Sequence, residues 1–165
     1  LGDVYKRQKE YLAFLRLILD TDCADLLDIE FFTAGADLPK LVEQAHSAGV
    51  AVVCSSHDFA KTPPRAELVS RMVQMQQAGA DLPKLAVMPR CRTDVLELLA
   101  TTAEMADLHP ETPVITMSMG ALGAVSRLAG ETFGSAMTFA NPGQASAPGQ
   151  VSLNIVNEVL DALHL

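Results

Sequence analysis

Apolar and polar positions follow two patterns that alternate along the chain. Five short apolar runs are candidate strands, and the middle runs are continuous, as in strands buried on both faces of a parallel sheet. These runs are Leu26–Phe32, Val50–Cys54, Leu85–Met88, Val114–Met119 and Ala136–Ala140. Between them, apolar residues recur every three or four positions, which predicts amphipathic helices.

Residues that cap or break helices place the predicted helices more closely. Asp37 is a candidate N-cap for a helix that Gly49 ends, and Pro63–Pro64 open another helix that closes at Gly79. Three further helices are predicted at Tyr11–Leu19, from Thr93 or Asp94 onward, and at Ser152–Leu165.

Strands that alternate with helices predict an α/β fold with a parallel sheet and right-handed crossovers. Two architectures fit this pattern. A five-stranded doubly wound sheet would use all 165 residues. A (β/α)8 TIM barrel normally needs about 250 residues, so the chain would supply part of one. The pattern alone leaves both open.

Charge and cysteine content exclude several classes of protein. The chain carries 20 acidic and 12 basic residues, a net charge of -8, which argues against a nucleic-acid partner or an anionic membrane surface. No run approaches the ~20 apolar residues of a membrane span. Cys23, Cys54 and Cys91 are widely spaced without a CxxC pair, so we expect reduced thiols, a cytoplasmic location and no metal site.

The heptapeptide GADLPKL occurs twice, at Gly35–Leu41 and Gly79–Leu85. The first copy continues into a helical pattern, and the second runs into an apolar strand. We therefore expect Lys40 to be a solvated surface residue and Lys84 to enter a buried strand. Burial disfavours a charged amine, and a neutral amine can form a Schiff base with a carbonyl. Lys84 can equally be a strand-end lysine whose amine reaches solvent.

Other polar residues lie where the predicted strands end. His57 follows an apolar run, at the end of a strand where active sites of parallel α/β folds gather, and an imidazole can move protons. It can also simply cap a loop. Asp28 and Glu30 alternate with apolar residues, so they face one side of the sheet together, as an active-site floor or as a structural layer of ion pairs. Arg127 can hold a carboxylate or form a surface ion pair.

Several long strings, in this order, resemble the type I 3-dehydroquinate dehydratase family. The resemblance runs from about Tyr11 to the C-terminus, and Ser56 departs from it because the family commonly has Asn before the histidine. The strings are DIEFF, VVCSSHDFAKTP, GADLPKLAVMP, PVITMSMG, SRLAGETFGS and QASAPGQ.

The resemblance implies a shikimate-pathway lyase that converts 3-dehydroquinate into 3-dehydroshikimate and water. Lys84 would form the imine with the C3 ketone, and His57 would be the general acid and base. The substrate would be bound by Arg127, Ser146 and Gln150, between walls formed by Met119 and Phe139. No metal or organic cofactor is implied, and family members are often homodimers.

The resemblance also implies a TIM barrel, of which this chain would supply about the last five strands. Residues 1–8 do not continue the family pattern and are expected to be a non-native leader before a partial barrel domain at residues 9–165. The family's missing strands carry other active-site groups, among them a glutamate that orients the histidine. We therefore expect the isolated chain to be poorly stable and to have little activity.

Two rival functions belong to other classes. A complete flavodoxin-like binding domain would use five strands as its entire fold, but the sequence shows no phosphate-binding first loop. Another Schiff-base barrel enzyme, such as a class I aldolase, would share Lys84 and should bind a substrate phosphate near the late strands. Arg127 and the segment Gln144–Gln150 suit a carboxylate-bearing polyol better.

Overall fold

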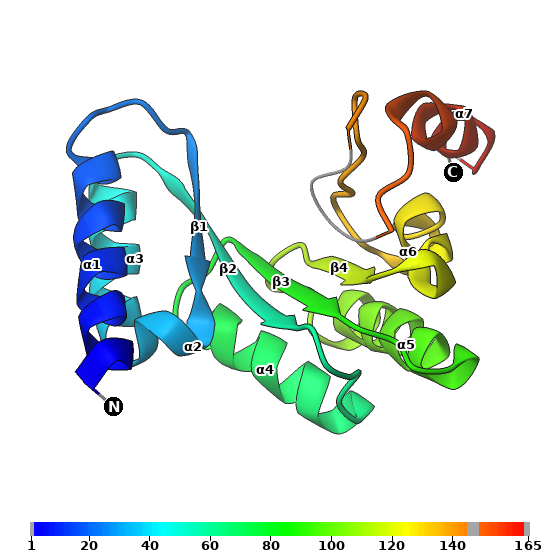
Figure 1. Cartoon of the computed structure of the whole chain (residues 1–165), viewed down its shortest axis with the longest axis horizontal. Helices are drawn as coiled ribbons and strands as arrows, with labels where there is room; N and C mark the ends of the chain where they lie inside the picture. The colour runs from blue at the N-terminus through cyan, green and yellow to red at the C-terminus, as the bar shows by residue number, and fades with distance from the viewer. Residues whose placement is uncertain (1, 145–148, 164–165) are drawn as a thin grey trace.

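The computed structural model of the chain describes residues 2–144 and 149–163. Its centre is a parallel sheet whose four strands neighbour one another in chain order (Figure 1). The strands are β1 (Leu26–Glu30), β2 (Ala51–Asp58), β3 (Leu82–Val87) and β4 (Ile115–Ser118).

The helices show how the sheet is wound. They are α1 (Gly2–Leu19), α2 (Phe31–Ala34), α3 (Leu38–Ser47), α4 (Arg65–Gln77), α5 (Arg92–Leu108), α6 (Val125–Leu128) and α7 (Leu153–Leu163). In Figure 1, α1, α3, α4 and α5 follow an arc along one side of the sheet. A doubly wound sheet would reverse its strand order and carry helices on both faces. The described residues instead have the winding of a barrel segment, so the flavodoxin-like alternative is wrong.

Two apolar layers lie on opposite faces of the sheet. The outer layer joins strand residues such as Ile29 and Val52 to helix residues such as Leu41, Leu68 and Leu98. The inner layer is formed mainly by strand residues and includes no residue of a described helix. It contains Val53, Ala86, Ile115, Met117 and Met119, with Leu82, Met88 and Phe139 packed against them.

The alternation of side chains decides which polar residues join the inner face. Leu27 and Ile29 of β1 are buried in the outer layer, so Asp28 and Glu30 point inward. By the same period of two, Ser55 and His57 share the inner face with Val53, and Lys84 shares it with Ala86.

Most predicted elements are confirmed, although their ends shift by a few residues. β2 continues past Cys54 through His57, and β3 begins at Leu82. Asp37 precedes α3 as predicted, but its carboxylate makes no capping bond and instead accepts a hydrogen bond of 3.5 Å from Arg16. α1 begins at Gly2 and runs through the predicted leader, whose non-native origin stays a prediction.

The fifth predicted strand, at Ala136–Ala140, is wrong. Val114 pairs with Ser135 in a single parallel bridge, and Ala136 N–H donates to the Val114 carbonyl at 2.8 Å. The next ladder position is taken by a side chain, because the Thr116 N–H donates to Ser135 Oγ at 3.1 Å. The backbone then leaves β4, so the segment forms no continuous ladder.

The two copies of GADLPKL have the different structures that their flanking sequences predict. The first forms a 3₁₀ turn at Gly35–Asp37 and then the start of α3, where Lys40 is exposed. The second enters β3, where Lys84 is only 8% exposed. The residues that follow the repeat thus decide its conformation.

Asp81, just before β3, ties three elements together at the amino end of the sheet. Its Oδ2 accepts the Val52 N–H at 2.7 Å and lies 2.8 Å from Nε2 of His46, in the last turn of α3. Desolvation raises the pKa of Asp81, but these two hydrogen bonds and the charge of His46 outweigh it, so the pKa is lowered.

We expect Asp81→Asn to lower the free energy of unfolding by about 1 kcal/mol at neutral pH, because the amide keeps an acceptor but loses the charge. A lowered folded-state pKa gives stability that is present above the ordinary value near 3.9 and is lost as the pH falls through the folded value. The deficit of the variant should therefore shrink in acid. Urea denaturation between neutral pH and about pH 3 measures it.

Asp107→Asn, on the exposed surface of α5, is the matched control and should stay within about 0.5 kcal/mol of the wild type. A deficit of Asp81→Asn that grows as the pH falls from about 5 to about 3, the range in which a carboxylate gains its proton, would contradict the assignment.

Gly149 itself lies against the backbone of Gly120, just beyond β4. It has a φ of 75°, and a Cβ there would lie only 2.3 Å from the carbonyl oxygen of Gly120. Both the left-handed backbone and the close approach require glycine. Gly143, in the same connection, has open space around the position of a Cβ.

Gly149→Ala should destabilise the chain by about 1–3 kcal/mol, because the added Cβ would overlap the Gly120 backbone and one of the two must shift. Gly143→Ala should change the stability by less than about 0.5 kcal/mol. Chemical denaturation of the two variants side by side checks this. Equal stabilities would show that this contact does not hold the segment.

Candidate active site

Lys84 lies at the centre of the inner face, on β3. Its Nζ donates a hydrogen bond to Asp28 Oδ2 on β1 at 2.7 Å and lies 5.0 Å from the centroid of the Phe139 ring. The lysine side chain is 10% exposed, whereas that of Asp28 is 42% exposed. The amine is therefore held from two sides, by a carboxylate and by an aromatic face.

His57 lies near the carboxyl end of β2, on the same face. Its Nδ1 is 2.5 Å from Glu30 Oε1, and its ring stacks on that of Phe59 with the centroids 5.9 Å apart. A carboxylate only accepts hydrogen bonds, so the contact assigns the proton of a neutral imidazole to Nδ1. The Nε2 lone pair is then left for other partners.

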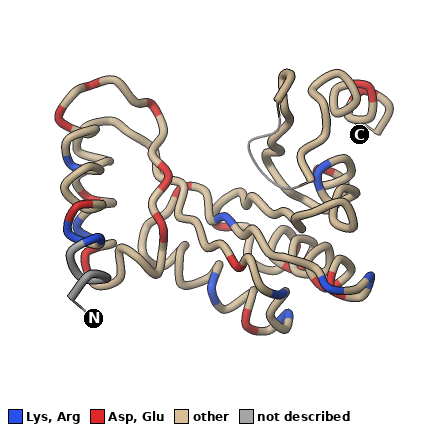
Figure 2. Tube along the Cα trace, viewed as in Figure 1, with Lys and Arg blue, Asp and Glu red and all other residues tan. Residues whose placement is uncertain are grey.

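β1 supplies the carboxylate partners of both Lys84 and His57 because its side chains alternate between the two faces of the sheet. Asp28 faces Lys84 and Glu30 faces His57. The Glu30 N–H, on a strand that has a sheet neighbour on one side only, donates to Tyr11 Oη of α1 at 2.9 Å. Figure 2 shows acidic residues both along the connection between α1 and β1 and on β1 itself. Both acids form pairs, as a structural layer would, and their partners are the two residues for which the sequence suggests chemistry.

Two other titratable groups near β1 stay neutral. Burial raises the pKa of the Tyr11 hydroxyl, and the negative charges of Glu30 and Asp28 raise it further. The hydrogen bond with the Glu30 backbone lowers the pKa, but the net change is upward. Burial also raises the pKa of Cys54 to about 12, helped by the charges of Asp28 and Glu30. Cys54 belongs to the outer layer, so it offers no thiolate nucleophile to the inner face.

Arg127 is buried rather than part of a surface ion pair, being 2% exposed on α6. Its Nη1 lies 3.5 Å from Sδ of Met117, an inner-layer residue, and burial lowers the pKa of its guanidinium. It also lines a hollow of about 210 Å³ that reaches Leu160 of α7. The guanidinium thus reaches the inner layer from the side of β4.

The remaining predicted site residues differ in where they lie. Met119 and Phe139 belong to or pack on the inner layer, and Phe139 contacts Lys84. Gln150 is half-buried, and its carbonyl accepts a hydrogen bond of 3.4 Å from Asn141. Ser146 lies outside the described residues. The sheet therefore brings together His57, Lys84, Met119 and Phe139.

Ser55 is a site residue that sequence reasoning missed. It is fully buried between Glu30 and Lys84 in the strand register, and within the described structure its Oγ has no hydrogen-bond partner. Counting back two residues from His57 would have placed it on the inner face. A buried hydroxyl without a partner costs free energy, so Ser55 can serve a ligand that brings one.

The part of the chain that the structure describes shows neither a metal site nor a helix that could cross a membrane. There, no group of three or more His, Cys, Asp or Glu side chains could hold a metal ion. No described helix is both long enough and apolar enough to cross a membrane.

The arrangement suits covalent chemistry on a carbonyl compound. A lysine amine on an apolar floor can attack a ketone, and the adjacent Asp28 carboxylate stabilises the positive charge of the resulting iminium ion. An imidazole with a fixed Nδ1 proton can accept and return protons at Nε2. Both groups project from neighbouring strands near one end of the sheet.

Comparison with known sequences places the chain among close relatives. A family model described as type I 3-dehydroquinase matches residues 2–165. The 3-dehydroquinate dehydratase of Clostridium kluyveri is 52% identical over 151 residues, which are 91% of this chain and 59% of the relative. That of Salmonella agona is 47% identical over 163 residues, or 99% of this chain and 65% of the relative. The chain thus spans about three fifths of the length of these curated relatives.

Solved structures agree with the sequence comparison. The type I 3-dehydroquinate dehydratase of Clostridium difficile, solved with covalently modified comenic acid, matches with a TM-score of 0.90 and 46% identity over 95% of this chain and 62% of that chain. The 3-dehydroquinate dehydratase of Geobacillus kaustophilus matches with a TM-score of 0.85 and 42% identity over 91% and 59%. The α/β fold with a parallel sheet, predicted from the sequence as part of a barrel, is confirmed.

Proposed function

The chain belongs to the type I 3-dehydroquinase family, and on this premise we propose that it carries the imine-forming part of a 3-dehydroquinate dehydratase active site. The observation that supports this most strongly is the buried Lys84 amine, which lies 2.7 Å from Asp28 beside the His57–Glu30 pair. The covalent ligand named for the Clostridium difficile relative is consistent with a covalent mechanism.

Lys84 begins the proposed reaction. In its neutral form, Nζ attacks the C3 ketone of 3-dehydroquinate and forms a carbinolamine. Loss of water gives a protonated imine, whose positive charge Asp28 faces. This iminium is an electron sink, so the adjacent C2 proton becomes acidic and its removal gives an enamine.

His57 moves the protons of these steps through Nε2, while Glu30 keeps the ring oriented through Nδ1. The enamine expels the C1 hydroxyl, which leaves as water with a proton from the imidazole. Hydrolysis of the product imine consumes one water, balancing the water lost when the imine formed. It releases 3-dehydroshikimate and regenerates the Lys84 amine, so the net products are 3-dehydroshikimate and one water.

Substrate binding is assigned to the side of the sheet beyond β4. Arg127 would pair with the substrate carboxylate, and its approach to the inner layer at Met117 supports this. Met119 and Phe139 would form apolar walls, and Ser146 and Gln150 would bind substrate oxygens. The mechanism uses no metal or organic cofactor.

Location and assembly belong to the proposal as well. The three cysteines are free thiols, and two of them are exposed, which supports a reducing compartment such as the cytoplasm. A homodimer stays a prediction of the family resemblance.

Lys84→Ala should abolish covalent trapping. We expect the wild-type chain, incubated with 3-dehydroquinate and sodium borohydride, to gain the mass of a reduced adduct, since reduction makes the imine permanent. Intact-mass spectrometry measures this gain. Lys40→Ala, the exposed lysine of the other GADLPKL copy, should form the adduct like the wild type. An adduct that survives in Lys84→Ala would contradict the assignment.

Turnover by the 165-residue chain alone should be very low, even though the imine forms. In the described residues β1 and β4 each have a strand neighbour on one side, and the chain spans 59–65% of the length of its relatives, so it would lack the groups that the family resemblance assigns to other strands. The absorbance of the conjugated enone product measures turnover. Dehydratase activity similar to that of a full-length relative under the same conditions would refute this expectation.

A further inference from the structure

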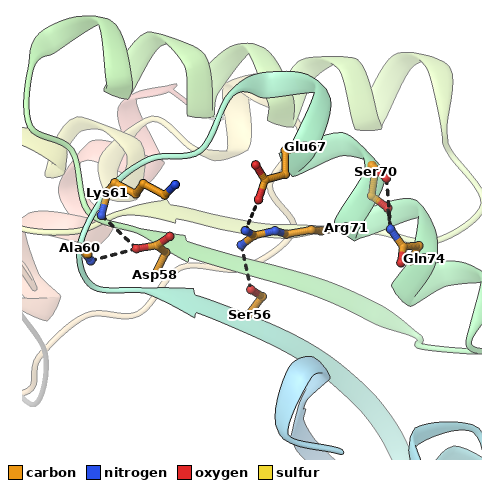
Figure 3. A network of polar contacts seen from close by, with 8 residues as sticks. All are labelled: Ser56, Asp58, Ala60, Lys61, Glu67, Ser70, Arg71 and Gln74. Atoms are coloured by element: carbon orange, nitrogen blue, oxygen red, sulfur yellow. Dashed lines mark hydrogen bonds and ion pairs between the residues drawn. The ribbon is translucent and has the colours of Figure 1, made fainter. Parts of the chain in front are cut away.

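Arg71 of α4 has three partners that come from three different elements. Its guanidinium pairs with Glu67, one turn earlier in the same helix, and Nη1 donates to Ser56 Oγ of β2 at 3.4 Å (Figure 3). The guanidinium carbon also lies 5.1 Å from the centroid of the Phe32 ring in α2, within the range of a cation–π contact. The side chain is only 16% exposed, so these contacts largely replace water.

Two of these partners adjoin the His57–Glu30 pair along the chain. Ser56 immediately precedes His57, and Phe32 follows Glu30 by two residues. Arg71 lies on the helix side of the sheet, whereas His57 and Glu30 face the inner side, so the guanidinium does not touch either of them. It links the backbone segments that carry the two side chains.

Arginine suits this position better than lysine. A planar guanidinium can lay its face on an aromatic ring while its edge donates hydrogen bonds in its own plane. The ammonium of lysine is a point charge, so it cannot lie on the Phe32 ring and donate to Ser56 at the same time. Glu67 balances the charge of Arg71 and, as a neighbour one turn away, limits its rotamers.

We propose that Arg71 is a positioning residue for the His57–Glu30 contact. By linking Ser56 to Phe32 it holds the ends of β2 and β1 at the separation at which Glu30 accepts the Nδ1–H of His57. The assignment rests on the proposed function of His57, because a single tautomer leaves Nε2 as the atom that exchanges protons with the substrate. Without Arg71 the two ends can move apart, and the neutral ring then exchanges between its two tautomers.

The test reads the tautomer of His57 directly. In protein labelled with ¹⁵N-histidine, long-range ¹H–¹⁵N spectra distinguish Nδ1–H from Nε2–H, and the His57 signals are identified by their loss in His57→Gln. Spectra are recorded at increasing pH and read where the ring signals no longer change with pH, so that only the neutral ring is compared. We expect one tautomer, Nδ1–H, in the wild type and a mixture of both in Arg71→Met.

Two matched variants separate positioning from a general effect on α4. Arg65→Met removes another arginine from the same helix, one whose ion pairs among the described residues are with Glu97 and Glu104 of α5, and should keep the wild-type tautomer. Arg71→Lys keeps the charge but should show the mixture, because lysine cannot join Ser56 to Phe32. A wild-type spectrum in folded Arg71→Met would overturn the proposal.

Ser56→Ala keeps the test decisive if Arg71→Met does not fold. It removes only the acceptor at the strand end and should move the tautomer balance in the same direction, by a smaller amount. An unchanged balance in Ser56→Ala would then overturn the proposal. The readout needs no substrate, so failure of borohydride trapping at Lys84 would refute the proposed function and leave the tautomer result standing.

Discussion

The alternation of β1 turns the carboxylates of Asp28 and Glu30 to one face of the sheet, where each meets a hydrogen-bonding partner, and the rest of the site depends on this constraint. Leu27 and Ile29 fill the apolar outer layer, so the alternation of β1 turns both acids inward. Charges that leave bulk water need partners. The parallel register supplies Lys84 from β3 for Asp28 and His57 from β2 for Glu30. The same pairs that satisfy the acids thus place an amine and an imidazole together.

The sequence predicts most of this arrangement because its signals are local. Continuous apolar runs locate the strands, and the residues that follow each GADLPKL copy separate the exposed Lys40 from the buried Lys84. The period of two turns Asp28 and Glu30 to one side. Which cation each acid would meet depends on strand order and register, which no local pattern contains. The resemblance attributed the orientation of the histidine to a glutamate on another strand, whereas in this chain Glu30 contacts His57.

Two predictions fail for one physical reason: a side-chain contact replaces the contact with the backbone that the sequence pattern predicts. The apolar run Ala136–Ala140 has the composition of a strand, but Ser135 Oγ takes the Thr116 N–H and ends the ladder. Asp37 has the position of an N-cap, but Arg16 takes its carboxylate. Ser55 was missed for a different reason, because serine within an apolar run resembles a tolerated core residue. In the first two cases a side-chain contact that no local pattern contains decides the outcome.

The coupling free energy between Asp28 and Lys84 tests the central claim most directly, because the claim is that charge pairs organise the inner face. The measurement is a double-mutant cycle of unfolding free energies for the wild type, Asp28→Asn, Lys84→Met and the double variant. The account predicts a favourable coupling free energy of about 1 kcal/mol or more, as for side chains in direct contact. Effects that add within about 0.3 kcal/mol, as for distant independent sites, would contradict it.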